Sequence, residues 1–226
     1  MPYEVVLFDL DFTLFDSERS ERKALSATFA DYDIAVNYEI LETYREFNSQ
    51  LWSDFEEKRI KLIDLRTERF RRLCRKLGFQ MNPGDLADTY EKNLGNYGAL
   101  YDGAEELLMS MKGQSKVGLI TNGLESVQKS RLHNYDLQKY FDVVLISGEC
   151  GLSKPDPAIF QMSLDLLHHT NKNSVIMIGD SLSSDVQGAT NFGIDSCWFN
   201  PHGLDKNPIY NPTFTVQSFA DIESLF

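Results

Sequence analysis

Short apolar runs alternate with amphipathic helical patterns along the C-terminal two-thirds of this 226-residue chain, and this alternation constrains its fold most strongly. Parallel strands need long crossover connections, so strand and helix in alternation predict a parallel, doubly wound sheet of the α/β class. Ligands of such folds bind beyond the carboxyl ends of the strands. The runs that we interpret as buried strands are residues 5–8, 117–120, 143–146, 175–178 and 196–199.

Two of the helices expected between these runs carry start signals. Asp102, with Glu105 three residues later, predicts a capping-box-like start. Asp156 followed by Pro157 predicts an N-cap and a first helical residue. Both starts precede apolar residues spaced along one helical face: Ala104, Leu107, Leu108 and Met111 after the first, and Phe160, Leu164 and Leu167 after the second.

The stretch from residue 17 to residue 99 interrupts the alternation. It contains no convincing strand and is rich in helix formers, charged residues and aromatic residues, which we interpret as mostly core. The simplest interpretation is a small helical domain inserted after the first strand. We therefore expect an α/β core domain at 1–16 and 100–226, and a helical domain at 17–99.

Composition excludes several classes of function. The formal net charge of −12 would repel nucleic acid polymers and anionic membranes, so we expect a small-molecule partner. If that small molecule is anionic, a metal or a local cation must bind it. Three widely spaced cysteines cannot form a complete disulfide framework, which favours a reducing cytoplasm. We expect neither a signal peptide nor a membrane span, because no suitable apolar stretch is present. The sequence leaves open whether the protein is a monomer or a homodimer.

Polar residues stand where the strand runs end. Asp9 and Asp11 follow the first run, and two carboxylates so close are costly unless a cation offsets them, or one attacks while the other moves protons. Because the carboxyl ends of parallel strands share one edge, residues after the other runs can converge with this pair. Those residues are Thr121 and Asn122, Lys154, Asp180 and Asp185.

The motifs at these positions are DLDFTL from residue 9, ITNG from 120, KPDP from 154 and GDSLSSD from 179. In order and placement they resemble the haloacid dehalogenase (HAD) superfamily, in particular its phosphatases. The resemblance implies a Rossmann-like core with a helical cap inserted after the first strand. Within the superfamily the chain is most similar to the YjjG-type pyrimidine 5′-nucleotidases, through the segment NSQLW from residue 48, the pair Arg69-Phe70 and the segment YDGA from residue 101.

This resemblance implies roles for the acidic residues. Asp9 would be the nucleophile that forms an aspartyl-phosphate, and an ionised carboxylate can attack without a base. Asp11 would protonate the leaving alkoxide and then take a proton from water. Mg²⁺, which prefers oxygen ligands, would bind a carboxylate oxygen of Asp9, the backbone carbonyl of Asp11 and the carboxylate of Asp180. Asp185 would orient water on that metal.

It also implies the groups that hold the substrate. The hydroxyl of Thr121, the backbone N–H of Asn122 and the ammonium of Lys154 would hold phosphoryl oxygens. In the cap, Asn48 and Trp52 are candidates for substrate specificity, since an aromatic face and an amide suit a flat base.

Together these features predict a cytoplasmic, Mg²⁺-dependent phosphomonoesterase that hydrolyses a small phosphorylated metabolite, with a pyrimidine nucleoside monophosphate the leading candidate. A sugar-phosphate phosphatase or a phosphomutase of the same fold is the alternative. A dehalogenase would need no metal and would lack the second acid, so Asp11 and Asp180 argue against it. A non-enzymatic phosphometabolite-binding protein is disfavoured because every motif position is filled.

Overall fold

The computed structural model describes residues 3–226, which divide into two compact units. The core unit consists of the described residues up to Asp16, Ala99–Asn122 and Asp136–Phe226. The helical unit consists of Ser17–Gly98 and Gly123–Tyr135. The segment 123–135 thus groups with the helical unit, whereas the division expected from the sequence placed it with the core.

Within the described residues, the core unit contains one parallel sheet in the order β3-β2-β1-β4-β5-β6. The expected α/β class and doubly wound parallel sheet are confirmed, and each of the five apolar runs is a strand. The sixth strand was not predicted, because it has three residues and only the last is buried. The strands are β1 (Val5–Phe8), β2 (Lys116–Thr121), β3 (Val143–Ile146), β4 (Val175–Gly179), β5 (Asp195–Phe199) and β6 (Phe214–Val216).

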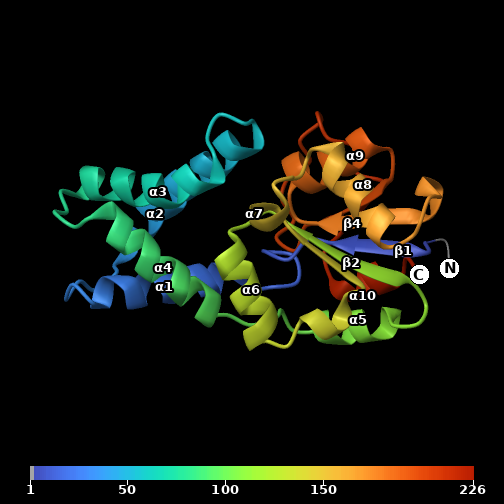
Figure 1. Ribbon diagram of the computed structural model, residues 1–226, viewed down its shortest axis with the longest axis horizontal. Helices are drawn as coiled ribbons and strands as arrows, with labels where there is room; N and C mark the ends of the chain where they lie inside the picture. Colours follow the sequence, from blue (N-terminus) through green and yellow to red (C-terminus); the bar gives the residue numbers. More distant parts are fainter. Residues whose placement is uncertain (1–2) are drawn as a thin grey trace. The chain divides into compact units, whose positions relative to one another are not determined.

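Helices cover both faces of this sheet, which explains why its central strands are apolar throughout. Every residue of β1 and β4 is buried. Figure 1 shows α8 and α9 on one side of the sheet, and α5 and α10 on the other. The core helices are α5 (Ala104–Met111), α7 (Ser147–Cys150), α8 (Pro157–Leu166), α9 (Gln187–Phe192) and α10 (Phe219–Glu223), with 3₁₀ turns at Gln138–Tyr140 and Lys172–Ser174 and a π-helical turn, η3, at Leu182–Val186.

The two predicted helix starts have different outcomes. At α8 the prediction is confirmed, since the Asp156 side chain accepts a hydrogen bond from the Ala158 N–H at 3.1 Å. At α5 it is wrong. The N-cap is Gly103, in the left-handed conformation with φ of 90°, and no side chain caps it. A glycine adopts that conformation without steric cost, so the chain turns into the helix one residue after Asp102.

The helical unit confirms the expected helical insertion. Its apolar core contains a cluster of aromatic rings in which Tyr44, Phe70 and Tyr90 lie with centroids 5.3–5.9 Å apart, as predicted for aromatic residues of this segment. Such offset and edge contacts add to the stability gained from burial. The helices are α1 (Ser17–Ala30), α2 (Tyr38–Glu56), α3 (Leu62–Leu77), α4 (Pro83–Asn96) and α6 (Glu125–Asn134).

The position of α6 explains why residues 123–135 group with the helical unit. The buried Arg131 side chain donates hydrogen bonds to the Leu94 carbonyl at 3.4 Å and to the Ser20 hydroxyl at 3.2 Å. Asn134 donates to the Gly95 carbonyl at 3.1 Å. These bonds fasten α6 to α1 and α4. An apolar pattern alone could not predict them, because they are made by polar side chains.

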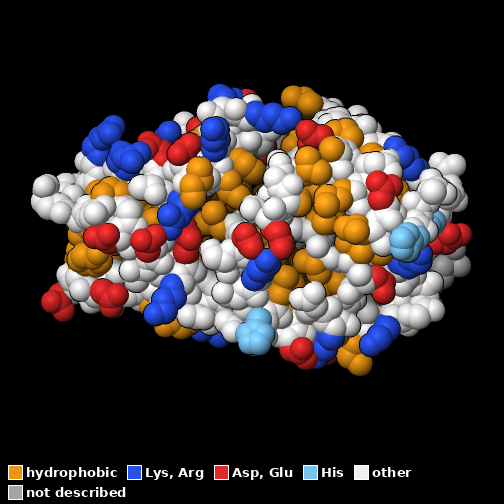
Figure 2. Space-filling model, viewed as in Figure 1, with side chains coloured by type: hydrophobic (Ala, Val, Ile, Leu, Met, Phe, Trp, Pro, Cys, Tyr) orange, Lys and Arg blue, Asp and Glu red, His pale blue; other side chains and the backbone are white. Residues whose placement is uncertain are grey.

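The surface carries charges of both signs close together. In the helical unit Arg66 pairs with Asp88 and Glu91, and Arg45 pairs with Glu18 at 2.6 Å. On the face drawn in Figure 2, Lys and Arg side chains lie interspersed with Asp and Glu. Among residues 3–226, no helix has both the length and the apolar character that crossing a membrane requires.

Candidate active site

The predicted core residues lie at the carboxyl ends of neighbouring strands. Asp9 directly follows β1, Thr121 ends β2, Asp180 follows β4, and Lys154 lies in the loop between α7 and α8. Because β1 pairs with both β2 and β4 in parallel, these ends meet at one edge of the sheet. The structure therefore brings Asp9, Lys154, Asp180 and Asp185 together, although they are far apart in sequence.

Lys154 lies at the centre of this group. Its side chain is 1% exposed, and Nζ lies 2.6 Å from Oδ1 of Asp9 and 2.7 Å from Oδ1 of Asp185. Burial alone would lower the pKa of the ammonium, but the carboxylates of Asp185 and Asp9 outweigh burial and raise the pKa above its usual range. Lys154 is therefore a permanent positive charge in the site.

The side chain of Asn122 fixes the position of Lys154. Its Nδ2 donates to the Lys154 carbonyl at 2.8 Å, and its Oδ1 accepts from the Lys154 N–H at 2.9 Å. The resemblance assigned a role only to the backbone N–H of Asn122, so this side-chain function was missed. Thr121, beside it, is fully buried at the end of β2.

Three carboxylates form a group that can hold a metal. One oxygen from each of Asp9, Asp180 and Asp185 lies within 4.8 Å of the others. The negative charge of the three exceeds the charge of the single Lys154 ammonium. Burial, followed by neighbouring carboxylates, raises the pKa of Asp9 to about 7 despite the ammonium, and burial with Asp9 and Asp185 raises the pKa of Asp180. A cluster of oxygen donors that carries excess negative charge fits a hard divalent cation such as Mg²⁺.

Asp185 is engaged from two sides. Its Oδ1 forms the ion pair with Lys154, and its Oδ2 accepts a hydrogen bond from the Ser181 N–H at 3.0 Å. Gly179 leaves space for this carboxylate, since a Cβ at that position would lie 2.1 Å from Oδ2. Because one oxygen is paired with the Lys154 ammonium and the other accepts a hydrogen bond, the geometry fits a residue that supports the metal ligands and Lys154.

Thr13 contacts two of the acids, although the sequence did not predict a role for it. Its hydroxyl lies 3.3 Å from Oδ2 of Asp9 and 3.3 Å from Oδ1 of Asp180, and it accepts a bond from the Asp180 N–H at 3.0 Å. The side chain is fully buried. Thr13 lies within the DLDFTL motif, so its place beside two aspartates was the signal that could have identified it.

Asp11 stands at the turn that follows Asp9. It is half-buried, and Phe12 next to it adopts the left-handed conformation with φ of 60°. Any residue other than glycine is sterically strained in that conformation, and such strain is common at functional sites. The negative charge of Asp11 is one cause of the raised pKa of Asp9, so the two carboxylates interact electrostatically.

The two specificity candidates lie in the helical unit, on α2. Asn48 is buried, where its Oδ1 accepts from Arg69 at 3.2 Å and its Nδ2 donates to Glu21 at 3.1 Å. Trp52 packs edge-to-face on Phe55, with ring centroids 5.7 Å apart. Their contact with a substrate remains a prediction.

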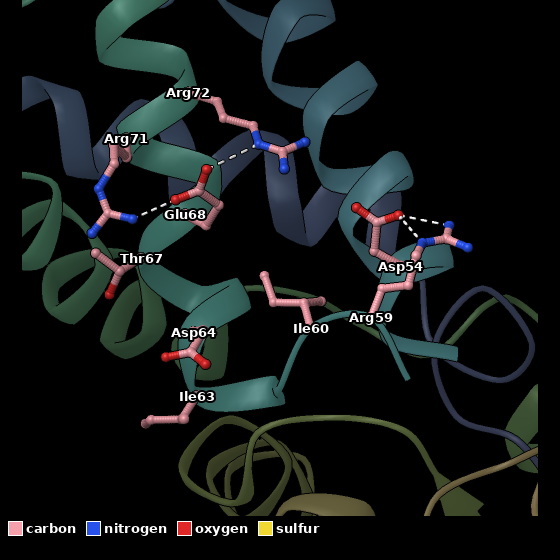
Figure 3. A pocket seen from close by; sticks show the side chains of 9 residues that line it. All are labelled: Asp54, Arg59, Ile60, Ile63, Asp64, Thr67, Glu68, Arg71 and Arg72. Carbon is pink, nitrogen blue, oxygen red and sulfur yellow. Dashed lines mark hydrogen bonds and ion pairs between the residues drawn. The ribbon is translucent and has the colours of Figure 1, made fainter. Parts of the chain in front are cut away.

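The helical unit also contains a cavity of about 510 Å³ at the C-terminal end of α2 and along α3. Figure 3 shows Arg59 turned toward Asp54, and Arg71 and Arg72 turned toward Glu68. Arg59 pairs with Asp54 at 2.7 Å, and Arg71 and Arg72 both pair with Glu68. Since each of these arginines is already paired with an acidic side chain, the cavity is a weaker candidate than the acidic group of the core.

Comparisons with known proteins agree with this geometry. A family model described as haloacid dehalogenase-like hydrolase matches residues 6–199. The pyrimidine 5′-nucleotidase YjjG of Escherichia coli (strain K12) is 32% identical over 225 residues, which cover 100% of this chain and 98% of that protein. The pyrimidine 5′-nucleotidase PynA of Streptococcus pneumoniae is 34% identical over 223 residues, covering 98% and 94%. The crystal structure of YfnB from Bacillus subtilis, bound to magnesium, is similar with a TM-score of 0.93 at 28% identity, covering 100% and 99%.

Proposed function

The chain belongs to the haloacid dehalogenase-like hydrolase family and is a phosphoric monoester hydrolase, and we propose that it dephosphorylates pyrimidine nucleoside 5′-monophosphates with Mg²⁺. The observation that carries the proposal is the group of Asp9, Asp180 and Asp185 around the buried Lys154, at the edge of the sheet where ligands of this fold bind.

Asp9 is the proposed nucleophile. Its Oδ1 faces the ammonium of Lys154 and its Oδ2 faces the hydroxyl of Thr13, so both oxygens are oriented by neighbours. One oxygen attacks phosphorus and forms a P–O bond while the bond from phosphorus to the ester oxygen breaks. Asp11, two residues later, donates its proton to the leaving alkoxide. It then removes a proton from the water that hydrolyses the aspartyl-phosphate.

Cationic and neutral donors receive the phosphoryl group. Lys154 supplies a fixed positive charge next to Asp9, and without it the carboxylates would repel an anionic substrate. Asn122 holds the main chain of Lys154 by two hydrogen bonds, which keeps the ammonium in place through the reaction. We assign the Thr121 hydroxyl and the Asn122 N–H as donors to the phosphoryl oxygens.

The carboxylates of Asp9 and Asp180, with the backbone carbonyl of Asp11, are the proposed Mg²⁺ ligands. When bound, the ion supplies the positive charge that the acidic group lacks and offsets the negative charge of the phosphoryl group. Asp185 supports this arrangement through its ion pair with Lys154.

The proposed substrate rests on two relatives named as pyrimidine 5′-nucleotidases, which match this chain over nearly all of its length at 32% and 34% identity. Asn48 and Trp52 on α2 are the residues that we assign to the nucleoside. Arg69 and Glu21 fix the orientation of the Asn48 amide, which leaves one amide hydrogen and one lone pair for a base edge.

Phosphate release from a panel of monophosphates, measured with Mg²⁺ and again with EDTA, tests the proposal. The panel contains dUMP, dTMP, UMP, purine nucleotides and sugar phosphates. We expect Mg²⁺-dependent release with a higher kcat/KM for the pyrimidine nucleotides. A preference for sugar phosphates would overturn the substrate assignment, an isomerised product would indicate a phosphomutase, and activity undiminished by EDTA would overturn the role of the metal.

A further inference from the structure

The tryptophan on β5 contacts the acidic site through one hydrogen bond. Trp198 is 3% exposed, and its indole N–H donates to the backbone carbonyl of Asp180 at 2.8 Å. Trp198 is the register partner of Gly179, the last residue of β4, so the carbonyl of Asp180 lies one residue beyond the ladder. The indole N–H therefore provides a hydrogen bond between β4 and β5 at a point where their regular backbone pairing has ended.

This hydrogen bond completes a set of contacts around Asp180. The N–H of Asp180 donates to the Thr13 hydroxyl at 3.0 Å, and Oδ1 lies 3.3 Å from the same hydroxyl. The residue is thus held at its N–H from the β1 side and at its carbonyl from the β5 side. With both peptide groups fixed, the backbone angles of Asp180 have little freedom, and they set the direction of its Cα–Cβ bond. The contact of Oδ1 with the Thr13 hydroxyl then orients the carboxylate.

Packing alone does not account for a tryptophan at this position. A phenylalanine can also fill a buried strand position and brings no polar atom, whereas an indole N–H needs a partner when it is buried. The neighbouring Phe199 illustrates the difference, because its ring stacks on Phe219 with centroids 5.1 Å apart and carries no donor.

We propose that Trp198 is a positioning residue for the metal site. Its indole N–H holds the main chain of Asp180 so that the carboxylate stays beside those of Asp9 and Asp185. The inference rests on the proposed function in so far as Asp180 binds Mg²⁺. Groups behind metal ligands commonly change metal affinity 10–100-fold when they are removed. Loss of the N–H is therefore expected to weaken Mg²⁺ binding without removing a ligand.

Trp198→Phe tests the proposal, with Phe199→Leu as the matched control on the same strand. Isothermal titration of EDTA-treated protein with Mg²⁺ measures the Kd directly, without turnover. We expect Trp198→Phe to raise the Kd about tenfold. It should also raise the Mg²⁺ concentration for half-maximal activity by the same factor, with kcat at saturating Mg²⁺ and KM for substrate unchanged. Phe199→Leu should lower the thermal midpoint and leave the Kd unchanged.

A second replacement covers the case in which Trp198→Phe does not fold. Benzothienylalanine keeps the shape of the indole and exchanges its N–H for sulfur, and the same tenfold increase in Kd is expected. If the protein with benzothienylalanine has the same Kd for Mg²⁺ as the wild-type protein, the inference is wrong. In that case the proposed function still stands, provided that the wild-type protein releases phosphate in a Mg²⁺-dependent way. If the wild-type protein binds no Mg²⁺, both the metal assignment and the inference are wrong.

Discussion

Replacing Gly179 by alanine perturbs the acidic site without changing any charge. Gly179 is the last residue of β4, and an added Cβ would lie 2.1 Å from Oδ2 and 2.3 Å from Cγ of Asp185. Ordinary van der Waals contact begins at 3.4 Å. In an interior as closely packed as that of a protein, the carboxylate must retreat by about 1.3 Å.

That retreat breaks the contacts that hold Asp185. The ion pair with Lys154 spans 2.7 Å and the bond from the Ser181 N–H spans 3.0 Å, so neither survives such a shift. Disrupting a buried ion pair costs roughly 3–5 kcal/mol. The lower chain entropy of alanine in the unfolded state offsets about 0.4–1 kcal/mol of this cost. We expect a net loss of about 3 kcal/mol in the free energy of unfolding. With Lys154 displaced, kcat should fall about 10²-fold.

Urea unfolding in EDTA measures the first quantity, and phosphate release with saturating Mg²⁺ and substrate measures the second. Gly118→Ala is the matched control on β2, because its Cβ would lie 2.8 Å from Cδ2 of Leu7, an apolar side chain. This control should lose stability and keep its kcat. Wild-type stability and wild-type kcat in Gly179→Ala would refute the argument that Asp185 packs against this glycine and supports Lys154.

Three further predictions concern the charges of the site. Lys154→Met removes the cation between Asp9 and Asp185, so kcat should fall about 10²–10³-fold, and an unchanged kcat would contradict the role of the ammonium. Between the ordinary Asp pKa of 3.8 and the native pKa of about 7, native Asp9 binds a proton that the unfolded chain releases. The thermal midpoint in EDTA should therefore fall as pH rises across that interval, and Mg²⁺ should reduce the slope; Lys154 stays protonated in both states there. Asp11→Asn should lower phosphate release about 10²–10⁴-fold while calorimetry still detects Mg²⁺ binding, and loss of that binding would contradict its assignment as a proton donor.

The sequence predicted those parts of the fold that follow from burial. β1 and β4 are continuous apolar runs because helices cover both faces of the sheet, and this pattern is readable without a structure. β6 escaped prediction since a three-residue strand at the edge leaves almost no pattern. The start of α5 was misplaced by one residue, because Asp102 matched a capping motif while Gly103 supplied the turn. Local motifs thus identify a helix more reliably than its first residue.

Prediction of the site divides along the same line. Asp9 and Asp180 directly follow strands, and Asp11, Asp185 and Lys154 lie in the segments that follow strand ends, so the parallel topology predicts that they converge. The residues that support these side chains act through long-range contacts, which a local sequence pattern does not predict. Thr13 reaches a residue 167 positions away, and Trp198 reaches one 18 positions away. Gly179 matters because the Asp185 carboxylate occupies the space that a Cβ at position 179 would need. Such roles emerge only when the strands are assembled.

Trapping the reaction on Asp9 tests the central claim most directly. Purified protein is mixed with Mg²⁺ and dUMP, quenched in acid within the first turnover, digested and analysed by mass spectrometry, with Asp9→Asn as the control. The account predicts one phosphoryl group on the peptide that contains Asp9, and neither phosphopeptide nor phosphate release in Asp9→Asn. Phosphate release by Asp9→Asn at the wild-type rate, or a phosphoryl group on a different residue, would contradict the account.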